Sequence, residues 1–358
     1  MTLYWLMFFL PCLMTVIRPH WTHAAQAKRA WELGFKLYFI ALILLVGLRY
    51  QVGADWHHYL APIELALQQN FFDFVFMPGD LAYSTLTWLS AHAGFGVYGV
   101  NLICAGIFAL GLAVFCQNSL HPWLALAVAV PYLVIVVAMG YTRQGVAIGL
   151  VMLGLVSLDK NNLTEFIAWM VMAALFHKTA LILIPLGIFA GRKSWVSIGG
   201  ILLIAVLLFF LLLAEYVDHL VAGYITDQYA SSGAAIRIAM NAVPAAIFLV
   251  FRKRFKLSDE QKMFWTWISF GGLLFIGLLA ISPSSTAVDR VALYWIPLQL
   301  YVWSRLPTAM AQTLSAQLPW VVLVLLYSLT VQFVWLFYAD HRFAWVPYQF
   351  YPWVWLWQ

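Results

Sequence analysis

Twelve apolar runs divide this sequence, and they restrict its fold more than any other feature. A transmembrane helix needs about 20 mainly apolar residues, so the shorter runs must extend into flanking residues to cross a bilayer. The runs are continuous rather than alternating, which disfavours a membrane barrel. We therefore predict an all-α polytopic membrane protein with about 12 transmembrane helices. The runs lie at about residues 3–17, 37–48, 95–115, 123–139, 145–158, 164–176, 178–190, 195–214, 235–251, 263–281, 291–304 and 319–338.

The composition supports this fold class. Of the 358 residues, 64% are hydrophobic and 9% are charged, whereas about a quarter of a soluble domain is charged. The three cysteines, Cys12, Cys104 and Cys116, fall in or at the ends of apolar runs and show neither a disulfide framework nor a metal-binding spacing. We expect no metal and no cofactor. No linker or repeat splits the chain, so residues 1–358 are predicted to form a single integral membrane domain.

The basic residues predict how the chain is oriented. If residues 18–36 are cytoplasmic and the runs alternate from there, most of the 19 Lys and Arg residues fall on the cytoplasmic side, above all RKRFK at 252–256. The net charge of +5 is thus explained by topology and does not indicate a nucleic-acid partner. Residues 79–93 are half polar and too short to span, so we expect an interfacial or re-entrant helix there. The external side receives isolated basic residues, namely Arg49, Arg143, Lys178, Arg237, Arg290 and Arg342.

The first external loop, LRYQVGADWHHYL at residues 48–60, gathers several ionisable groups directly after an apolar run. Arg49 and Asp55 are candidates for a site, or else they form an ion pair or an interfacial anchor that pins the loop. Gly53 between them indicates a tight turn. His57 and His58 are adjacent and would point about 100° apart on a helix, so they do not suit a metal pair.

Arg143 lies in AMGYTRQGVAIG, residues 138–149, where two apolar runs are joined almost without a loop. This places it at the N-terminus of the following helix, where unpaired N–H groups and the helix dipole favour an anion. An arginine at this position would complete an anion clamp. The alternative is a cation that simply extends to the membrane surface.

His177 and Lys178 separate two further apolar runs in ALFHKTALILIPLG, residues 174–187. A histidine at such a place suits proton transfer near neutral pH or a phosphate contact. A structural histidine between two helices is the simpler alternative.

The same side receives two more candidate groups. Asp289 and Arg290 begin another span in SPSSTAVDRVALYW, with Tyr294 one turn further along. The alternative for this pair is an interfacial ion pair. The C-terminal segment at 337–358 is rich in aromatic residues, which is typical of a membrane-interface belt, and it carries His341 and Arg342.

Together these positions predict one external pocket. Four hairpins raise Arg49, Arg143, His177 and Arg290 to the same membrane face. Such a pocket would suit a multiply charged anion at headgroup depth, for example a lipid pyrophosphate.

Three motifs in this order give the chain a resemblance to a known family. RYQVGADWHHY, TRQGVAIG and FHKTALILIP resemble elements of the EpsG-like, Wzy-type polymerases of O-antigen and exopolysaccharide, and the VPY near the C-terminus also looks similar. The resemblance is closest over about residues 37–190. The matching residues are Arg49, Gly53, Asp55, Tyr59, Arg143, Gln144 and His177.

The resemblance implies a membrane glycosyltransferase of the GT-C type in the bacterial inner membrane, with its site on the periplasmic or exterior side. Such an enzyme would transfer a glycan chain from undecaprenyl pyrophosphate onto the next lipid-linked repeat unit, with inversion and without a metal. A flippase and a chain-length regulator would be further partners. The implied pyrophosphate-binding residues are Arg49, Arg143 and Arg290. His177 would contact the phosphate or act as the base, and Asp55 is the rival base or orients Arg49. Supporting residues are Gln144, Tyr59, Lys178, Asp289, Tyr294, His341 and Arg342.

Other classes of membrane protein would share some of these features. An O-antigen ligase or another GT-C transferase would use a similar lipid-linked donor, although such ligases usually carry one long periplasmic loop. A membrane acyltransferase would also need a histidine at the bilayer surface. A polysaccharide transporter would need charges along a path through the membrane, and the mid-helix positions here are nearly free of charge.

Overall fold

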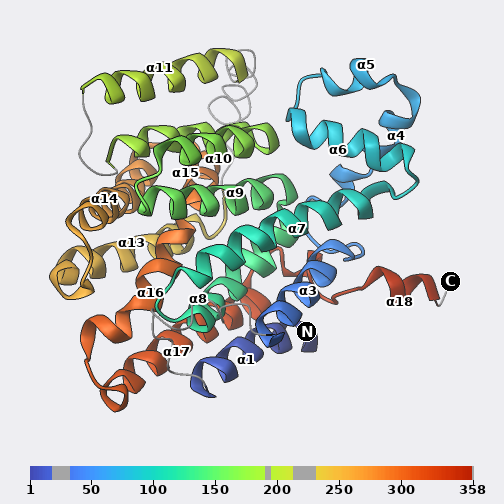
Figure 1. Ribbon diagram of the computed structural model, residues 1–358. Helices are drawn as coiled ribbons and strands as arrows, with labels where there is room; N and C mark the ends of the chain where they lie inside the picture. The colour runs from blue at the N-terminus through green and yellow to red at the C-terminus, as the bar shows by residue number, and fades with distance from the viewer. Residues whose placement is uncertain (18–32, 190–194, 213–230, 357–358) are drawn as a thin grey trace. The chain divides into compact units, whose positions relative to one another are not determined.

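The computed structural model describes residues 1–17, 33–189, 195–212 and 231–356, and within these ranges the regular structure is helical (Figure 1). Two compact units make it up. Unit 1 comprises Met1–Met152, Met172–His177 and Leu325–Gln358, and unit 2 comprises Leu153–Val171 and Lys178–Val324. The predicted all-α class is therefore confirmed, while a single domain over residues 1–358 stays a prediction.

The predicted runs become helices with boundaries close to those expected. In unit 1 the helices are α1 (Thr2–Ile17), α3 (Leu33–Gly47), η1 (His57–Tyr59), α4 (Ala61–Gln68), α5 (Phe71–Val75), α6 (Leu81–His92), α7 (Gly96–Gln117), α8 (Pro122–Ala129), the π-helix η2 (Val130–Ala138), η8 (Arg342–Ala344) and α18 (Tyr351–Leu356). In unit 2 they are η3 (Lys178–Phe189), α11 (Trp195–Leu212), α13 (Ala234–Phe251), η6 (Arg252–Phe255), α14 (Asp259–Ile281), α15 (Ser285–Ala292), η7 (Leu293–Trp295) and α16 (Ile296–Met310). Three helices contribute residues to both units, namely α9 (Thr142–Asp159), α10 (Leu163–Phe176) and α17 (Leu314–Tyr338).

The predicted number of about 12 spans is not confirmed. Five helices in the described ranges are long and apolar enough to cross a membrane, and six further apolar helices are shorter. The five are Gly96–Gln117, Thr142–Asp159, Ala234–Phe255, Asp259–Ile281 and Leu314–Tyr338. The run expected at 291–304 is divided among α15, η7 and α16. A run of apolar residues indicates that a segment is buried or faces lipid. It does not show whether the helix is long enough to cross the bilayer.

The core of unit 1 is built around α8 and η2, whose side chains are buried throughout. A helix that is apolar on every side must be enclosed by other helices or by lipid. Here α1 packs against α8, and α3 packs against α7. Close approach between α7 and α9 depends on glycine, because a Cβ added at Gly111 would lie 1.9 Å from the carbonyl oxygen of Gly149. Small residues at such crossings are typical of membrane helices.

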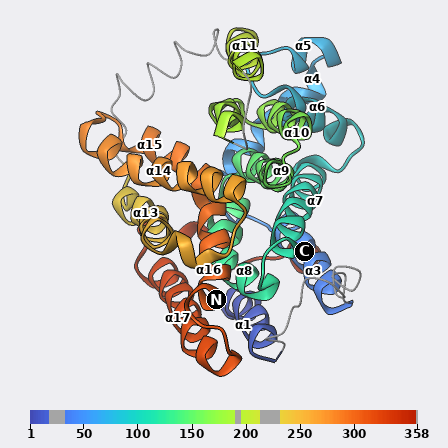
Figure 2. The ribbon, with the colours of Figure 1, turned by 60° about the vertical axis from the view of Figure 1, so that its left-hand side comes forward.

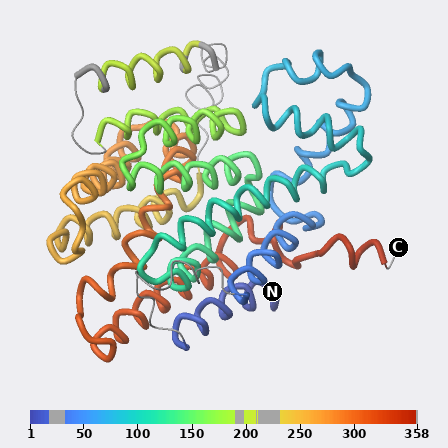
Figure 3. The backbone as a smooth tube through the Cα atoms, viewed as in Figure 1, coloured from blue at the N-terminus to red at the C-terminus, as the bar shows by residue number. Residues whose placement is uncertain are grey.

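A small helical cap precedes α7, consisting of η1, α4, α5 and α6 (residues 57–92), and the chain can be followed through it in Figure 3. The sequence predicted a helix over residues 79–93, and α6 spans Leu81–His92. Ala66, Phe74, Val75 and Ala91 form the buried centre of the cap. Because α6 turns directly into α7, the cap stands at the N-terminal end of a membrane-length helix. Asp80 occupies the position immediately before α6.

The C-terminal segment at residues 339–356, which we name the C-terminal strap, folds back onto the first loop. The backbone N–H of Tyr351 donates to the carbonyl of Leu48 at 2.8 Å, and the N–H of Gly53 donates to the carbonyl of Ala344 at 2.8 Å. The indole of Trp345 is buried and donates to the carbonyl of Ile135 at 2.7 Å. The aromatic density that suggested an interface belt therefore partly serves to fasten the strap inside unit 1.

Unit 2 packs α13 against α14 and α16, as Figure 2 shows for the neighbouring pair α13 and α14. Buried amides tie these helices together. The Asn241 side chain donates to the carbonyl of Ala292 at 2.8 Å and accepts a hydrogen bond from Gln299 at 2.8 Å. Buried polar groups of this kind are stable because each finds a partner. They fix the register of α13 against α15 and α16.

Candidate functional site

Arg143 is the second residue of α9, and it pairs with Asp80 at the start of α6. Its Nη1 lies 3.1 Å from Oδ2 of Asp80, and the arginine side chain is 46% exposed while that of the aspartate is 8% exposed. The tight turn between η2 and α9 raises the arginine to the end of the helix, as the sequence predicted. The arginine is thus accessible on one side and held by a buried carboxylate on the other.

His177 approaches the same carboxylate oxygen from a different helix. It directly follows α10, and its backbone N–H donates to the carbonyl of Ala173 at 2.8 Å. Its Nδ1 lies 3.7 Å from Oδ2 of Asp80, which is too long for a hydrogen bond. That nitrogen is buried without a hydrogen-bond partner in the structure. We call Asp80, Arg143 and His177 the Asp80 cluster.

Two tyrosines line the protein side of the Asp80 cluster. The guanidinium of Arg143 lies 5.9 Å from the ring centroid of Tyr83, which is one turn beyond Asp80 on α6. The rings of Tyr83 and Tyr59 are 6.0 Å apart. Burial raises the pKa of Tyr83 well above its ordinary value, Tyr59 adds to the shift, and Arg143 opposes it. Burial raises the pKa of Tyr59 as well as that of Tyr83. Both hydroxyls therefore stay protonated and neutral near the arginine.

Arg49 lies inside the protein rather than on the pocket surface. It is 1% exposed, and its guanidinium donates to the carbonyls of Val46 and Val52 and to the side chains of Asn101 and Thr142. Burial lowers its pKa. The contact to Thr142 Oγ1, at 2.7 Å, ends on the residue immediately before Arg143. Arg49 therefore fixes the first turn of α9, on which Arg143 stands.

The rest of the first-loop motif reinforces the same helix end. The backbone N–H of Thr142 donates to the hydroxyl of Tyr59 at 3.1 Å. Gly53 has φ +105°, and a Cβ there would lie 2.5 Å from the carbonyl oxygen of Met139. Asp55 is partly exposed in the turn. Burial is the largest cause of the raised pKa of Tyr59, and the charge of Asp55 is the second. The motif residues thus press the first loop against the turn before α9.

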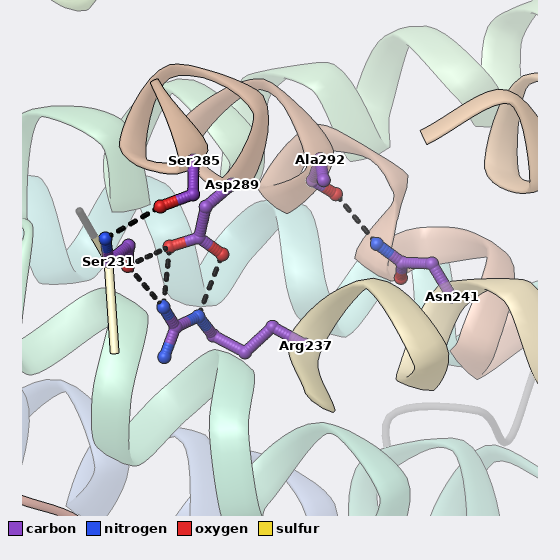
Figure 4. Close-up of polar contacts among 6 residues, drawn as sticks. All are labelled: Ser231, Arg237, Asn241, Ser285, Asp289 and Ala292. Carbon is purple, nitrogen blue, oxygen red and sulfur yellow. Dashed lines mark hydrogen bonds and ion pairs between the residues drawn. The ribbon is translucent and has the colours of Figure 1, made fainter. Parts of the chain in front are cut away.

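Unit 2 holds a second charged group around Asp289 (Figure 4). Arg237 binds this carboxylate through two N–H groups, Nε to Oδ1 at 2.7 Å and Nη2 to Oδ2 at 2.8 Å. Ser231 donates to Asp289 at 3.0 Å, and its backbone N–H donates to Ser285 Oγ at 2.8 Å. Asp289 is therefore the partner of Arg237, which lies 52 residues away. This bidentate pair ties α13 to α15.

The other predicted residues are placed as follows. Arg290 is partly exposed on α15, and the hydroxyls of Tyr294 and Thr179 lie 3.1 Å apart within unit 2. Gln144 is buried and Lys178 is partly exposed. His57, His58, His341 and Arg342 are exposed, and Arg342 donates to the carbonyl of Phe337. The topology predicted from the basic residues also puts Glu215, Asp218 and Asp227 on the external side, and these three acids lie outside the described residues.

Two residues at the centre of these charged groups, Asp80 and Arg237, were not predicted as site residues from the sequence. Asp80 stands where an N-cap residue is expected, which is a structural role for aspartate, yet its side chain makes no cap hydrogen bond. Arg237 appeared as one isolated external cation among several. Of the four residues predicted to share a pocket, the structure brings Arg143 and His177 together. Among the described residues, no group of three or more His, Cys, Asp or Glu is placed to hold a metal ion.

These features define a polytopic helical membrane protein with a charged cluster at the end of a membrane-length helix. The EpsG family model matches residues 34–350, so this chain belongs to the EpsG family. The family resemblance inferred from the motifs is confirmed, and the chain is a membrane protein of the polysaccharide polymerase-like kind. A search of curated proteins finds no match, and neither does a search of solved structures.

Proposed function

We propose that this chain polymerises lipid-linked oligosaccharide repeat units. It transfers a glycan chain from undecaprenyl pyrophosphate onto the next lipid-linked unit. The family membership supports a polymerase, and the observation that carries the site assignment is the meeting of Arg143 and His177 on one buried carboxylate. An exposed cation and a proton-accepting group side by side are what transfer from a pyrophosphate leaving group requires.

The proposed reaction is a single displacement with inversion. The acceptor hydroxyl oxygen attacks the anomeric carbon of the donor glycan, and a new C–O bond forms. The bond from that carbon to the pyrophosphate oxygen breaks, and its electron pair leaves with the lipid pyrophosphate. The hydroxyl proton passes to the base. Charge therefore builds up on the pyrophosphate while a proton must be removed from the acceptor.

Arg143 is the proposed ligand of the pyrophosphate. Its guanidinium is the part of the Asp80 cluster that solvent reaches, with a side chain 46% exposed. It stands in the first turn of α9, where the helix dipole adds to its attraction for an anion. A preorganised cation aimed at the leaving group stabilises the charge that develops as the bond breaks.

His177 is the proposed base, in preference to Asp55. Its Nδ1 faces the Asp80 carboxylate, which leaves Nε2 directed away from that group. A carboxylate on one nitrogen orients the ring and favours the tautomer whose other nitrogen accepts a proton. Asp55 lies in the first-loop turn, where its charge acts on Tyr59. Asp55 remains the rival base, and Arg49 takes a supporting role because it is buried.

The proposed setting follows from the charge pattern. The basic cluster at 252–256 favours a cytoplasmic position for that segment, and if the predicted runs alternate across a bacterial inner membrane, the turn before α9 faces the outside. Lipid-linked repeat units would reach the site after a flippase has moved them across, and a chain-length regulator would be a further partner. That Arg290 also contacts pyrophosphate stays a prediction from the sequence.

The test uses the purified full-length chain in nanodiscs, supplied with undecaprenyl-pyrophosphate-linked repeat units. A ladder of lipid-linked products is expected. Arg143→Ala should lower kcat/KM by about 10²–10³, the usual effect of removing one group that stabilises developing negative charge. Arg143→Lys should retain part of the activity, because it keeps the charge but not the two-pronged geometry. Normal product lengths with correctly inserted Arg143→Ala would contradict the proposal.

An acceptor comparison separates the polymerase from its rivals. A ligase would transfer the glycan to a lipid A core and give no ladder with repeat units alone. An acyltransferase would leave the lipid-linked units unchanged. A transporter would move labelled units between the leaflets without lengthening them. Arg290→Ala in the same assay tests the remaining sequence-based prediction.

A further inference from the structure

One oxygen of Asp80 serves two functional groups, and this sharing indicates how the site responds to its substrate. We propose that Asp80 is an internal anion that occupies Arg143 in the substrate-free protein. When a phosphate group binds Arg143, the carboxylate is released from it and closes onto His177. This inference rests on the proposed function, because it assigns the phosphate to the lipid pyrophosphate.

The Asp80 carboxylate occupies an unusual place for a residue at a helix start. Asp80 precedes α6, where an aspartate side chain normally caps the first turn. Here the side chain makes no cap hydrogen bond and is 8% exposed. Its Oδ2 lies instead beside Arg143 and His177. A helix-capping contact has thus been given up in favour of the cluster, and the buried position holds the carboxylate between its two neighbours.

The contact between Asp80 and Arg143 has the weaker of the two geometries available to a guanidinium. Asp80 meets the guanidinium through a single nitrogen at 3.1 Å. The same chain shows what a closed pair looks like, because Arg237 grips Asp289 with two nitrogens at 2.7 and 2.8 Å. Two parallel N–H bonds give the stronger geometry. A phosphate can take that geometry on the exposed side of Arg143, whereas Asp80 does not, so a phosphate has the advantage in a competition.

Only a short distance separates the Asp80 carboxylate from His177. The gap of 3.7 Å between Nδ1 and Oδ2 exceeds a normal hydrogen bond by about 0.5–1 Å. The nitrogen is buried without a hydrogen-bond partner. Release from Arg143 allows the carboxylate to close this gap. The ring then donates a hydrogen bond from Nδ1–H to Asp80. Its Nε2 accepts the proton of the attacking sugar hydroxyl.

Binding of the donor would therefore prepare the base. The coupling is reciprocal: if pyrophosphate binding at Arg143 favours the contact between Asp80 and His177, that contact favours pyrophosphate binding by the same factor. In the substrate-free protein, by contrast, the pairing neutralises an exposed arginine. Asp80 is a positioning residue in this scheme, because it acts through Arg143 and His177 and does not touch the substrate.

The experiment measures binding of inorganic pyrophosphate to the purified chain in nanodiscs by calorimetry, with Asp80→Asn as the main variant. Removing the competing charge should tighten pyrophosphate binding about five-fold or more, in the usual range of site coupling. Turnover of lipid-linked units should fall in the same variant. A residue with a purely structural role would weaken both. Unchanged or weaker pyrophosphate binding by folded Asp80→Asn would overturn the inference.

Arg143→Gln provides the matched control. The gain in affinity requires the arginine, so Asp80→Asn should have no effect on pyrophosphate binding when Arg143→Gln is already present. A gain of the same size in both backgrounds would mean that Asp80 acts only through its general charge, and it would contradict the exchange.

A further variant keeps the test decisive if Asp80→Asn does not fold. His177→Ala removes the group to which the carboxylate moves. If the exchange takes place, this variant should bind pyrophosphate about two- to five-fold more weakly than the wild type. No loss of affinity would contradict it. The proposed function is judged separately by the product ladder: binding shifts without a ladder would reject the polymerase, and a ladder without binding shifts would reject the exchange.

Discussion

The guanidinium of Arg49 donates a hydrogen bond of 2.7 Å to Oγ1 of Thr142, the residue that precedes Arg143. Two arginines with opposite environments thus stand next to the same helix end. Arg49 is 1% exposed and Arg143 has a side chain 46% exposed. One supports the first turn of α9 from within, and the other presents its charge outward. This difference leads to a matched comparison.

Arg49→Met should destabilise the protein far more than Arg143→Met. Removing the buried guanidinium takes the donor away from the carbonyls of Val46 and Val52, while Asn101 Oδ1 keeps its hydrogen bond from Thr142 at 3.3 Å. Hydrogen bonds to a charged group contribute about 1.5–3 kcal/mol each, so a loss of about 3 kcal/mol or more in the free energy of unfolding is expected. Thermal unfolding in detergent measures it. Arg143→Met should lose activity and should lower Tm by less than Arg49→Met, because it removes one hydrogen bond and His177 stays beside the Asp80 carboxylate. An equal or larger fall in Tm for Arg143→Met would contradict the scaffold role of Arg49.

His177→Gln and Asp55→Asn together decide the base. His177→Gln should lower kcat by about 10²–10⁴-fold, as expected for loss of general base catalysis, with little change in KM. Asp55→Asn should leave kcat within about ten-fold of wild type, because its carboxylate lies in the first-loop turn. Initial rates with lipid-linked units give both values. The reverse order of effects would assign the base to Asp55.

Gly53→Ala should disturb the site from a distance. At φ +105° the added Cβ would lie 2.5 Å from the carbonyl oxygen of Met139, and an unfavourable backbone conformation alone costs about 1–3 kcal/mol. The turn before α9 would have to move, so both Tm and kcat should fall. Gly94 offers a control, since it also has positive φ but nothing within 4 Å of its Cβ position. Gly94→Ala should lower Tm with little effect on kcat. Similar loss of kcat in both variants would argue against a specific contact at Gly53.

The pair Arg237–Asp289 should behave as a closed structural ion pair. Arg237→Leu leaves the buried Asp289 carboxylate without this cation, which typically costs about 3–5 kcal/mol, and Asp289→Leu should cost less because the Arg237 side chain is 15% exposed. The double variant should cost clearly less than the sum, with a coupling of about 2 kcal/mol or more. Thermal unfolding of the four proteins completes the cycle. Additive losses would mean that the two residues contribute independently.

Local sequence was sufficient for much of the fold. The apolar runs predicted the positions of the helices, because a long apolar segment must satisfy its backbone internally in a helix. The half-polar stretch at 79–93 likewise predicted α6. The number of spans did not follow, since the same apolar composition suits both a full span and a shorter buried helix. The tight turn before α9 was also evident, and with it the position of Arg143 at the start of a helix.

The sequence by itself therefore determined which segments are helical, which residues stand at helix ends, and which family the motifs resemble. The tertiary structure decided which charges meet. Asp80 and Arg143 are 63 residues apart in the chain, and Arg49 and Thr142 are 93 apart. Nothing in a local pattern distinguishes a capping aspartate from one that binds a distant arginine, or a surface arginine from a buried one. Those choices depend on how helices pack, because burial leaves each polar group to find its partner among whatever side chains the packing brings near.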